Sequence, residues 1–257
     1  MSWDPGQYLR FGDARLRPAL DLLDRIGAYE PGLVVDAGCG PGTVIPHIAG
    51  RWPRARVVGV DASPEMLREA EASNPGVELV EADLARWEPD APLDVLFSNA
   101  TLHWLDDHEE LFPRLAGLLA PGGWLAVQMP FNHHAPSHTI ISEVVAGGPW
   151  ASRLAPIERP FPVAEVPVYQ QLFSPLSAHL EIWETVYWQA LVGVDPVAEW
   201  AKGSVLRPLL AALDPEARPA FLAEYADRVR PAYPPGDDGT TWLPFRRLFI
   251  VVQARPG

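Results

Sequence analysis

Short apolar runs alternate with amphipathic stretches between residues 32 and 128 of the chain. The apolar runs predict five strands, at Leu33–Asp36, Arg56–Val60, Val77–Glu81, Leu93–Ser98 and Trp124–Met129. The stretches between them predict helices near Val44–Arg51, Pro64–Ala72 and Asp107–Leu119. Because this alternation is typical of a parallel sheet with helices on both faces, the pattern predicts a doubly wound α/β domain.

Local signals predict where these helices begin and end. Ser63, followed by a proline, is typical of an N-cap and a first helical position. Asp106 and Glu109 have the spacing of a capping box. Pro113 lies inside the helix that follows and is expected to kink or split it. A Pro-Gly-Gly run at 121–123 is expected to end that helix and turn into the fifth strand.

The pattern changes after Met129. Residues 130–176 are rich in proline and glycine and have little periodicity, which is typical of a functional lid or insertion. His179–Leu191 regains strand character, and residues 195–233 read as helices. Arg247–Ala254 is the expected final strand. We therefore expect one domain over 1–257, with cap elements near 1–25, 130–176 and 192–243.

Composition limits the possible classes of protein. The chain has 257 residues, is 48% hydrophobic and has no run of 18 apolar residues, so a globular protein without a membrane span is expected. Its net charge of −13 argues against a nucleic-acid partner, whose phosphates need a basic surface. A single cysteine, Cys39, and an N-terminus without a signal pattern favour a cytoplasmic location. The expected assembly is a monomer or a weak homodimer.

The most informative segment joins the first expected strand to its helix. Asp36 ends the strand, and Gly38, Gly40 and Gly42 follow at alternate positions. A dinucleotide fingerprint would need glycine where Thr43 stands, and the chain lacks the Gly-Lys-Ser/Thr end of a phosphate-binding loop. An acid before the turn repels a pyrophosphate and attracts an amino group. The turn therefore favours S-adenosylmethionine, which has an ammonium and a sulfonium but no phosphate.

Further polar residues follow the ends of successive strands, where open α/β sheets bind ligands. Asp61 is placed to accept ribose hydroxyls, and Asp83 to accept the adenine amine. Asn99 ends the fourth strand and is expected to face the methionine part of the cofactor. Taken singly, Asp61 is equally typical of a residue near a helix N-cap and Asp83 of a turn. Three acids at adjacent strand ends favour the cofactor reading.

These motifs resemble the class I S-adenosylmethionine-dependent methyltransferases and, within them, the trans-aconitate 2-methyltransferases. The resemblance runs almost from end to end. It rests on Trp3-Asp4-Pro5 with Tyr8 and Phe11, Arg17-Pro18, Cys39-Gly40-Pro41-Gly42, Arg51-Trp52-Pro53, Asp61 through Met66, Glu81-Ala82-Asp83, Leu102-His103-Trp104, Ala126 through Pro130, Leu206-Arg207-Pro208 and Phe245 through Phe249.

The resemblance implies a seven-stranded sheet with an antiparallel last strand and a helical cap. It also implies O-methylation of one carboxylate of trans-aconitate, or of a related tricarboxylic acid, to the monomethyl ester. The expected cofactor residues are Asp36, Gly38, Cys39, Gly40, Asp61, Ala62, Met66, Ala82, Asp83, Leu84 and Asn99.

An acidic chain that binds a polyacid needs cations close to the acceptor. Arg207 and Arg247 are the best candidates, and Arg246 and His133 follow. Weaker candidates are Arg17, His134 and His138. A surface position is the competing reading for each arginine. No metal site is expected, although His134 and His138 are four residues apart.

A carboxylate is already nucleophilic at neutral pH, so the expected reaction needs no general base. His103 is therefore either a proton-transfer group or a packing residue beside Trp104. A neutral or aromatic small-molecule acceptor is the alternative substrate. The chain lacks the motif of a nucleic-acid amine methyltransferase after its fourth strand, and Thr43 disfavours an oxidoreductase. A non-catalytic module that binds the cofactor is the alternative outside the enzymes.

Overall fold

The computed structural model describes residues 12–158 and 161–257, with the side chains of 12–15 excluded. These residues form two compact units, which are described separately. The first unit extends to Pro130 and also contains Pro162–Thr185 and Arg247–Gly257. The second unit contains Phe131–Phe161 and Val186–Arg246. Trp3, Tyr8 and Phe11, which contribute to the family resemblance, lie outside the described residues.

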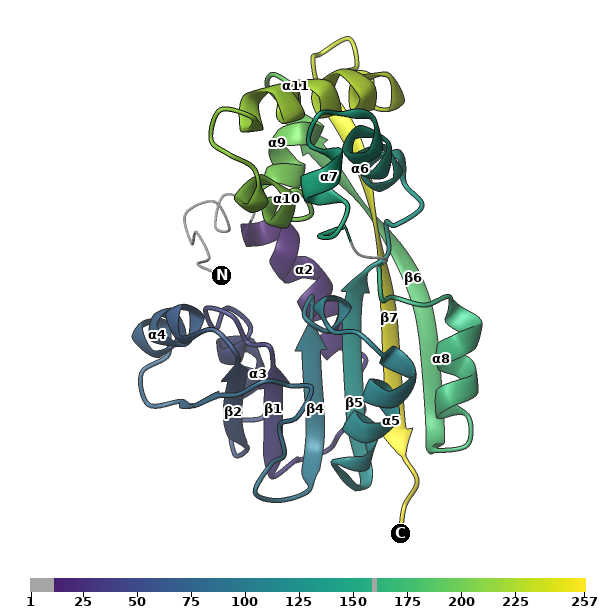
Figure 1. Cartoon of the computed structure of the whole chain (residues 1–257). Coiled ribbons are helices and arrows are strands. Elements are labelled where there is room, and N and C mark those ends of the chain that lie inside the picture. Colours follow the sequence, from purple (N-terminus) through teal and green to yellow (C-terminus); the bar gives the residue numbers. More distant parts are fainter. Residues whose placement is uncertain (1–11, 159–160) are drawn as a thin grey trace. The chain divides into compact units, whose positions relative to one another are not determined.

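A seven-stranded sheet has the strand order β3-β2-β1-β4-β5-β7-β6 (Figure 1). β3, β2, β1, β4 and β5 pair in parallel, and β7 pairs antiparallel with β5. The doubly wound sheet and its antiparallel last strand are therefore confirmed. The strands are β1 (Leu33–Ala37), β2 (Arg56–Asp61), β3 (Glu78–Glu81), β4 (Leu93–Asn99), β5 (Leu119–Pro130), β6 (Ser177–Leu191) and β7 (Thr241–Ala254).

Helices of the first unit pack against this sheet. α2 contacts β4 and β5, α3 contacts β2, and α4 contacts β2 and β3. α5 contacts β5 and α8, and the Tyr169 hydroxyl lies 2.6 Å from His108 Nδ1 between these two helices. Val34, Val95, Phe97, Ala126 and Ile250 are completely buried in the sheet. The elements are α2 (Gly12–Leu23), α3 (Ile45–Arg51), α4 (Pro64–Ser73), η1 (Leu102–Trp104), α5 (His108–Gly117) and α8 (Val166–Phe173).

Three expectations around α5 need correction. The N-cap is Asp107 in the left-handed conformation (φ 55°), without a side-chain cap bond, so the expected capping box does not begin the helix. Pro113 does not split the helix. The Pro-Gly-Gly run does not end it either, because the run lies inside β5. There, Leu119 pairs with Leu93 but Trp124 pairs with Val95, so the extra residues form a bulge.

The second unit is mainly helical. α11 packs against α6 and α9, and the Tyr225 hydroxyl donates to the carbonyl of Ser137 at 2.8 Å. Among the described residues, no helix is both long and apolar enough to cross a membrane. The elements are α6 (Pro136–Gly147), α7 (Ala151–Leu154), α9 (Pro196–Lys202), α10 (Arg207–Ala212), α11 (Arg218–Val229) and η2 (Arg230–Ala232).

Residues 130–176 differ from their expected irregular character, because α6, α7 and α8 occupy much of this segment. Proline lies at the first or second position of α6 and α8, where its missing N–H leaves no helical bond unmade. Proline therefore starts these helices and does not prevent them. The expected last strand was also too short, because β7 begins six residues earlier, at Thr241.

Candidate active site

The glycine turn after β1 is tied to the end of β2. Gly38 N and Cys39 N both donate to the carbonyl of Val60, at 2.7 and 3.0 Å. Gly40 N donates to Asp61 Oδ2 at 2.9 Å. The turn and the acid that ends the neighbouring strand are therefore one hydrogen-bonded unit.

Glycine is required in this turn for two different reasons. Gly38, Gly40 and Gly42 have φ values of 80°, 55° and 76°, in the left-handed region that glycine adopts most easily. A Cβ on Gly38 would lie only 2.1 Å from the side chain of Thr101, so close packing also excludes a larger residue. A Cβ on Gly40 would meet no atom of the described residues within 4 Å. Open space therefore lies beside the Gly40 backbone.

Asp61 connects two backbone turns. Its Oδ2 accepts from Gly40, and its Oδ1 accepts from Ser63 N at 2.8 Å. Ser63 in turn caps α4 by accepting from Met66 N at 3.3 Å, as expected from its sequence context. A carboxylate oxygen can accept two hydrogen bonds, so both oxygens of Asp61 can still accept one from a ligand hydroxyl.

The pKa of Asp36, the acid before the glycine turn, is strongly raised. It is only 2% exposed, and no hydrogen-bond donor among the described residues reaches its Oδ2. Burial, and secondarily the negative charge of Asp61, raise the pKa of Asp36 from 3.8 to about 7. A ligand cation at this carboxylate would stabilise the ionised form.

The remaining cofactor candidates lie around the ends of β2 and β3. Ala82 N donates to the carbonyl of Asp61 at 3.0 Å, which joins the two strand ends. Asp83 is exposed, and its Oδ1 accepts from Ala85 N at 3.0 Å, as a turn residue does. Leu84 and Met66 are buried, and Ala62 is exposed. Cys39 is also buried, which raises the pKa of its thiol well above the usual range.

The segment after β4 closes against the glycine turn. Thr101 Oγ1 donates to the carbonyl of Gly38 at 3.1 Å. Between Asn99 and Thr101, Ala100 has a φ of 53°, which is uncommon for a residue other than glycine. Asn99 Oδ1 is buried without a donor from any described residue. His103 is 9% exposed and its ring centroid lies 4.7 Å from that of Trp104, so it packs beside this tryptophan.

A buried polar pair joins β5 to β7. Arg247 is 5% exposed and Gln128 is completely buried, and Arg247 Nη1 donates to Gln128 Oε1 at 3.0 Å. Sequence reasoning did not assign Gln128 or Thr101 to the site. A signal for Gln128 existed, because it is the one polar residue in the otherwise apolar run from Leu125 to Met129.

The other acceptor candidates belong to the second unit or to α2. Arg207 begins α10 and is partly exposed, and Arg17 on α2 is exposed. Arg246 is exposed, with its guanidinium 5.8 Å from the centroid of the Phe131 ring. The side-chain amide of Asn132 donates to the backbone carbonyl of Arg246 and accepts from its backbone N–H.

The three histidines of the second unit lie near one another. The His133 and His134 ring centroids are 4.1 Å apart. Burial, and secondarily the proximity of His133, lower the pKa of His138 to about 4. His138 is therefore neutral at pH 7 and provides no positive charge to an acceptor.

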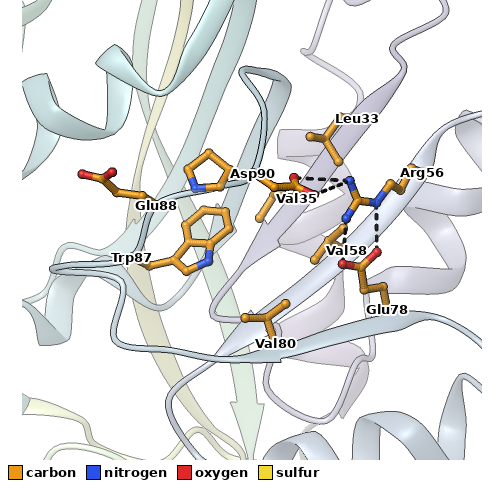
Figure 2. A pocket seen from close by; sticks show the side chains of 10 residues that line it. Leu33, Val35, Arg56, Val58, Glu78, Val80, Trp87, Glu88 and Asp90 are labelled. Carbon is orange, nitrogen blue, oxygen red and sulfur yellow. Dashed lines mark hydrogen bonds and ion pairs between the residues drawn. The ribbon is translucent and has the colours of Figure 1, made fainter.

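A separate hollow lies at the opposite ends of β1 and β2, where Leu33 and Arg56 begin these strands. Figure 2 shows Arg56 paired there with Glu78 and Asp90. Arg56 is the one cation among the described residues that line the hollow, and these two acids neutralise it. This hollow is therefore not the acceptor site for a polyacid.

Comparisons with known proteins define the class. Residues 34–123, which contain the glycine turn and the strand-end acids, match the family model described as "Methyltransferase domain". The YcgJ protein from Bacillus has a similar fold, with a TM-score of 0.59, 18% identity, and coverage of 94% of this chain and 100% of that one. A Haemonchus contortus phosphoethanolamine N-methyltransferase matches with a TM-score of 0.55 and 18% identity, over 94% of this chain and 53% of that one. The matched segment is therefore similar to a methyltransferase domain, and the two solved structures share its fold.

Relatives in sequence are more specific. The trans-aconitate 2-methyltransferase of Azoarcus sp. is 46% identical over 97% of this chain and 98% of its own length. That of Methylobacterium nodulans is also 46% identical, over 98% of each chain. That of Streptomyces avermitilis is 42% identical over 98% of this chain and 97% of its own length. The chain belongs to the trans-aconitate 2-methyltransferase family.

Proposed function

We propose that this chain transfers the methyl group of S-adenosylmethionine to a carboxylate of trans-aconitate, or of a related tricarboxylic acid. The product would be the monomethyl ester. The observation that carries this proposal is the 46% identity to trans-aconitate 2-methyltransferases over nearly the whole of both chains. The identity extends far beyond the methyltransferase segment at 34–123, so it includes residues outside the shared cofactor motif.

The proposed cofactor site is the glycine turn with its strand-end acids. Asp36 would face the ammonium group, Asp61 the ribose hydroxyls and Asp83 the adenine amine. Two features support this fit: the Asp36 carboxylate has an oxygen without a donor among the described residues, and open space lies beside Gly40. Cys39, Ala62, Met66, Ala82, Leu84 and Asn99 would complete the site. When bound, the cofactor supplies an electrophilic methyl group.

The protein's contribution to the reaction would be alignment. A carboxylate oxygen is ionised at neutral pH, so the chain has to hold it in line with the methyl group and exclude water, without removing a proton. His103, in our proposal, shapes this region through its packing beside Trp104 and does not act as a base. Arg247 would bind one acceptor carboxylate, and Arg207, Arg246 and His133 are the further candidates.

A neutral or aromatic acceptor is the competing substrate. The buried position of Arg247 argues against it. The planar, positively charged Arg247 guanidinium matches a carboxylate in charge and shape, and a neutral acceptor lacks that match. A carboxylate can instead accept two parallel hydrogen bonds from the planar guanidinium.

The test is a methyl-transfer assay with trans-aconitate, cis-aconitate, citrate, isocitrate and a neutral aromatic alcohol. Release of S-adenosylhomocysteine is measured, and the ester is identified by mass spectrometry. We expect turnover with the tricarboxylates and the highest kcat/KM with trans-aconitate. Turnover of the neutral alcohol alone would reject the polyacid proposal.

Arg247→Lys gives the matched test of the pocket. Lysine keeps the charge but not the two-pronged geometry, so the KM for trans-aconitate should rise about tenfold or more, as expected for a lost charged hydrogen bond. Arg255→Lys, an exposed position just beyond the other end of β7, is the control and should leave KM unchanged. If Arg247→Lys and Arg255→Lys have the same KM for trans-aconitate, Arg247 does not bind the acceptor.

The proposed enzyme is cytoplasmic and acts as a monomer or weak homodimer on a small-molecule substrate. Light scattering over a range of protein concentrations tests the assembly state.

A further inference from the structure

Gln128 occupies an unusual position for a glutamine. It lies near the end of β5, is completely buried, and pairs in register with Asn99 on one side and Phe249 on the other. Its neighbours along the strand, Val127 and Met129, are also completely buried. An apolar residue of similar size would fit this environment without a polar group to satisfy, so the amide itself needs an explanation.

The hydrogen bond to Arg247 determines which way the amide points. A guanidinium has only donors, and the NH₂ group of glutamine does not accept, so Oε1 has to face Arg247 Nη1, 3.0 Å away. The NH₂ group therefore points away from the guanidinium. Among the described residues, no acceptor reaches Nε2. A buried donor without an acceptor costs about 1–3 kcal/mol, so this group is suited to a ligand that brings one.

Register places Gln128 on the same face of the sheet as the proposed site. Paired residues of neighbouring strands project to the same side, so Gln128 and Asn99 share a face. Phe97, two residues before Asn99, pairs with Asp36, which is therefore on that face as well. Arg247 is two residues before Phe249, the partner of Gln128, and thus also projects there. All four residues lie near the carboxyl ends of the parallel strands.

We propose that Gln128 is the second half of a carboxylate clamp for the acceptor. Its Oε1 orients the Arg247 guanidinium, and its Nε2 donates a hydrogen bond to an oxygen of the carboxylate that Arg247 binds. This inference rests on the proposed function and identifies the group that recognises the acceptor.

A carboxylate at Gln128 has two possible sources, the acceptor and the amino-acid end of the cofactor. Their geometry favours the acceptor. Asp36 and Gln128 are two strands apart and two residues apart along the strands, which separates their backbones by about 12 Å. The ammonium and carboxylate of the cofactor are bonded to one carbon atom. If Asp36 binds the ammonium, that carboxylate is held near β1 and away from β5.

The test compares Gln128→Met with Gln128→Glu. Methionine has a similar length but no polar group, and glutamate replaces the NH₂ donor by a negative oxygen that repels a carboxylate. Gln253→Met is the matched control, because Gln253 lies at the other end of β7 and its side chain donates to the carbonyl of Gly122 at 3.3 Å, far from Arg247 along the strand. Thermal unfolding identifies any variant that does not fold. Gln128→Met removes an unsatisfied donor but also the acceptor of the buried Arg247 Nη1, so we expect a lower unfolding temperature, and binding is measured only at temperatures where the variant is folded.

Calorimetry measures binding of S-adenosylhomocysteine, and then of trans-aconitate to that complex, while kinetics separate KM from kcat. For Gln128→Met we expect the Kd and KM of trans-aconitate to rise at least tenfold, with a still larger rise for Gln128→Glu. Affinity for S-adenosylhomocysteine should change less than twofold, and Gln253→Met should resemble the wild type. Unchanged acceptor KM in a folded Gln128→Met variant would overturn the clamp, and so would a loss confined to S-adenosylhomocysteine.

Failure of the proposed function gives a different result. If wild-type protein does not methylate trans-aconitate, the same variants are measured with whichever acceptor of the panel is turned over. A carboxylic acid whose KM rises in Gln128→Met supports the clamp with another substrate. A neutral acceptor that has the same KM in wild type and Gln128→Met would reject both the clamp and the proposal that the substrate is a polyacid.

Discussion

Replacing Asp36 by asparagine should stabilise the ligand-free protein and weaken its binding to the cofactor. The side chain is 2% exposed, and its pKa is raised from 3.8 to about 7. One pKa unit corresponds to about 1.4 kcal/mol, so holding this carboxylate ionised in the folded state costs at most about 4 kcal/mol. Asparagine has nearly the same shape without the charge, and we expect it to recover between about 1 and 4 kcal/mol at pH 8.

The contribution of Asp36 to the stability of the folded protein depends on pH. Between about pH 4 and pH 7 the folded protein keeps a proton on Asp36 that the unfolded chain has lost. Stability contributed by this group is therefore fully present below pH 4 and is lost as the pH rises through 7. The advantage of Asp36→Asn should shrink by up to about 2.7 kcal/mol between pH 8 and pH 5, which is two pKa units at about 1.4 kcal/mol each.

Thermal unfolding of the ligand-free proteins at pH 5 and pH 8 measures this difference, at about 2–4 °C per kcal/mol for a chain of this size. Asp83→Asn is the matched control. Asp83 is an exposed strand-end acid, and asparagine keeps its acceptor for Ala85 N, so little change is expected at either pH. An Asp36→Asn protein that is less stable than wild type at pH 8, or whose advantage does not depend on pH, would show that burial does not raise the pKa of Asp36 in this way.

Asp36→Asn should weaken cofactor binding, although it stabilises the ligand-free protein. Loss of a charged hydrogen bond to the cofactor ammonium should reduce S-adenosylhomocysteine affinity by about 1.5–3 kcal/mol, or roughly ten- to 150-fold. In the wild type, affinity should fall up to tenfold for each pH unit below 7, because the empty site is then protonated. Calorimetry should find this slope abolished in Asp36→Asn. A wild-type affinity that is constant from pH 5.5 to 8 would contradict the placement of the ammonium at Asp36.

Four further outcomes are expected. Asp61→Ala should lower S-adenosylhomocysteine affinity by about 2–3 kcal/mol in calorimetry, since it removes a charged acceptor together with a tie to Gly40, and unchanged affinity would contradict its role. His103→Gln should keep substantial activity with a flat rate between neutral and mildly alkaline pH, and a thousandfold loss of kcat in folded protein would instead indicate acid–base chemistry. Gly38→Ala should lower the unfolding temperature, because its Cβ would lie 2.1 Å from Thr101. Arg207→Ala should raise the KM for trans-aconitate about tenfold or more with cofactor affinity unchanged, and an unchanged KM would exclude it from acceptor binding.

Much of the fold followed from local chemistry. Apolar runs bounded by glycine and proline located the parallel strands to within a few residues, except at the start of β5. Asp36 and Asp61 could be assigned to one site from sequence, because the carboxyl ends of adjacent parallel strands meet at one edge of a sheet. The two acids do lie near each other, since the negative charge of Asp61 contributes to the raised pKa of Asp36.

Helix signals were less reliable where proline was abundant. Residues 130–176 suggested irregular structure, yet proline at the first or second helical position starts α6 and α8. Position within the helix decides the effect of proline, and composition does not record that position. The bulge at 121–123 was missed for a related reason, because it depends on pairing with Leu93 and Val95 of β4.

The glycine turn, the order of strands and α-helices between residues 32 and 128, and the family could be inferred from residue types and spacing alone. The burial and pairing of the polar groups at the end of the sheet depend on tertiary contacts and could not be inferred in this way. Gln128 and Arg247 are 119 residues apart in sequence and meet only because β7 inserts beside β5. The raised pKa of Asp36 likewise arises from burial by distant parts of the chain. Residue type and spacing are local properties, whereas pairing across strands and desolvation depend on which segments the fold brings together.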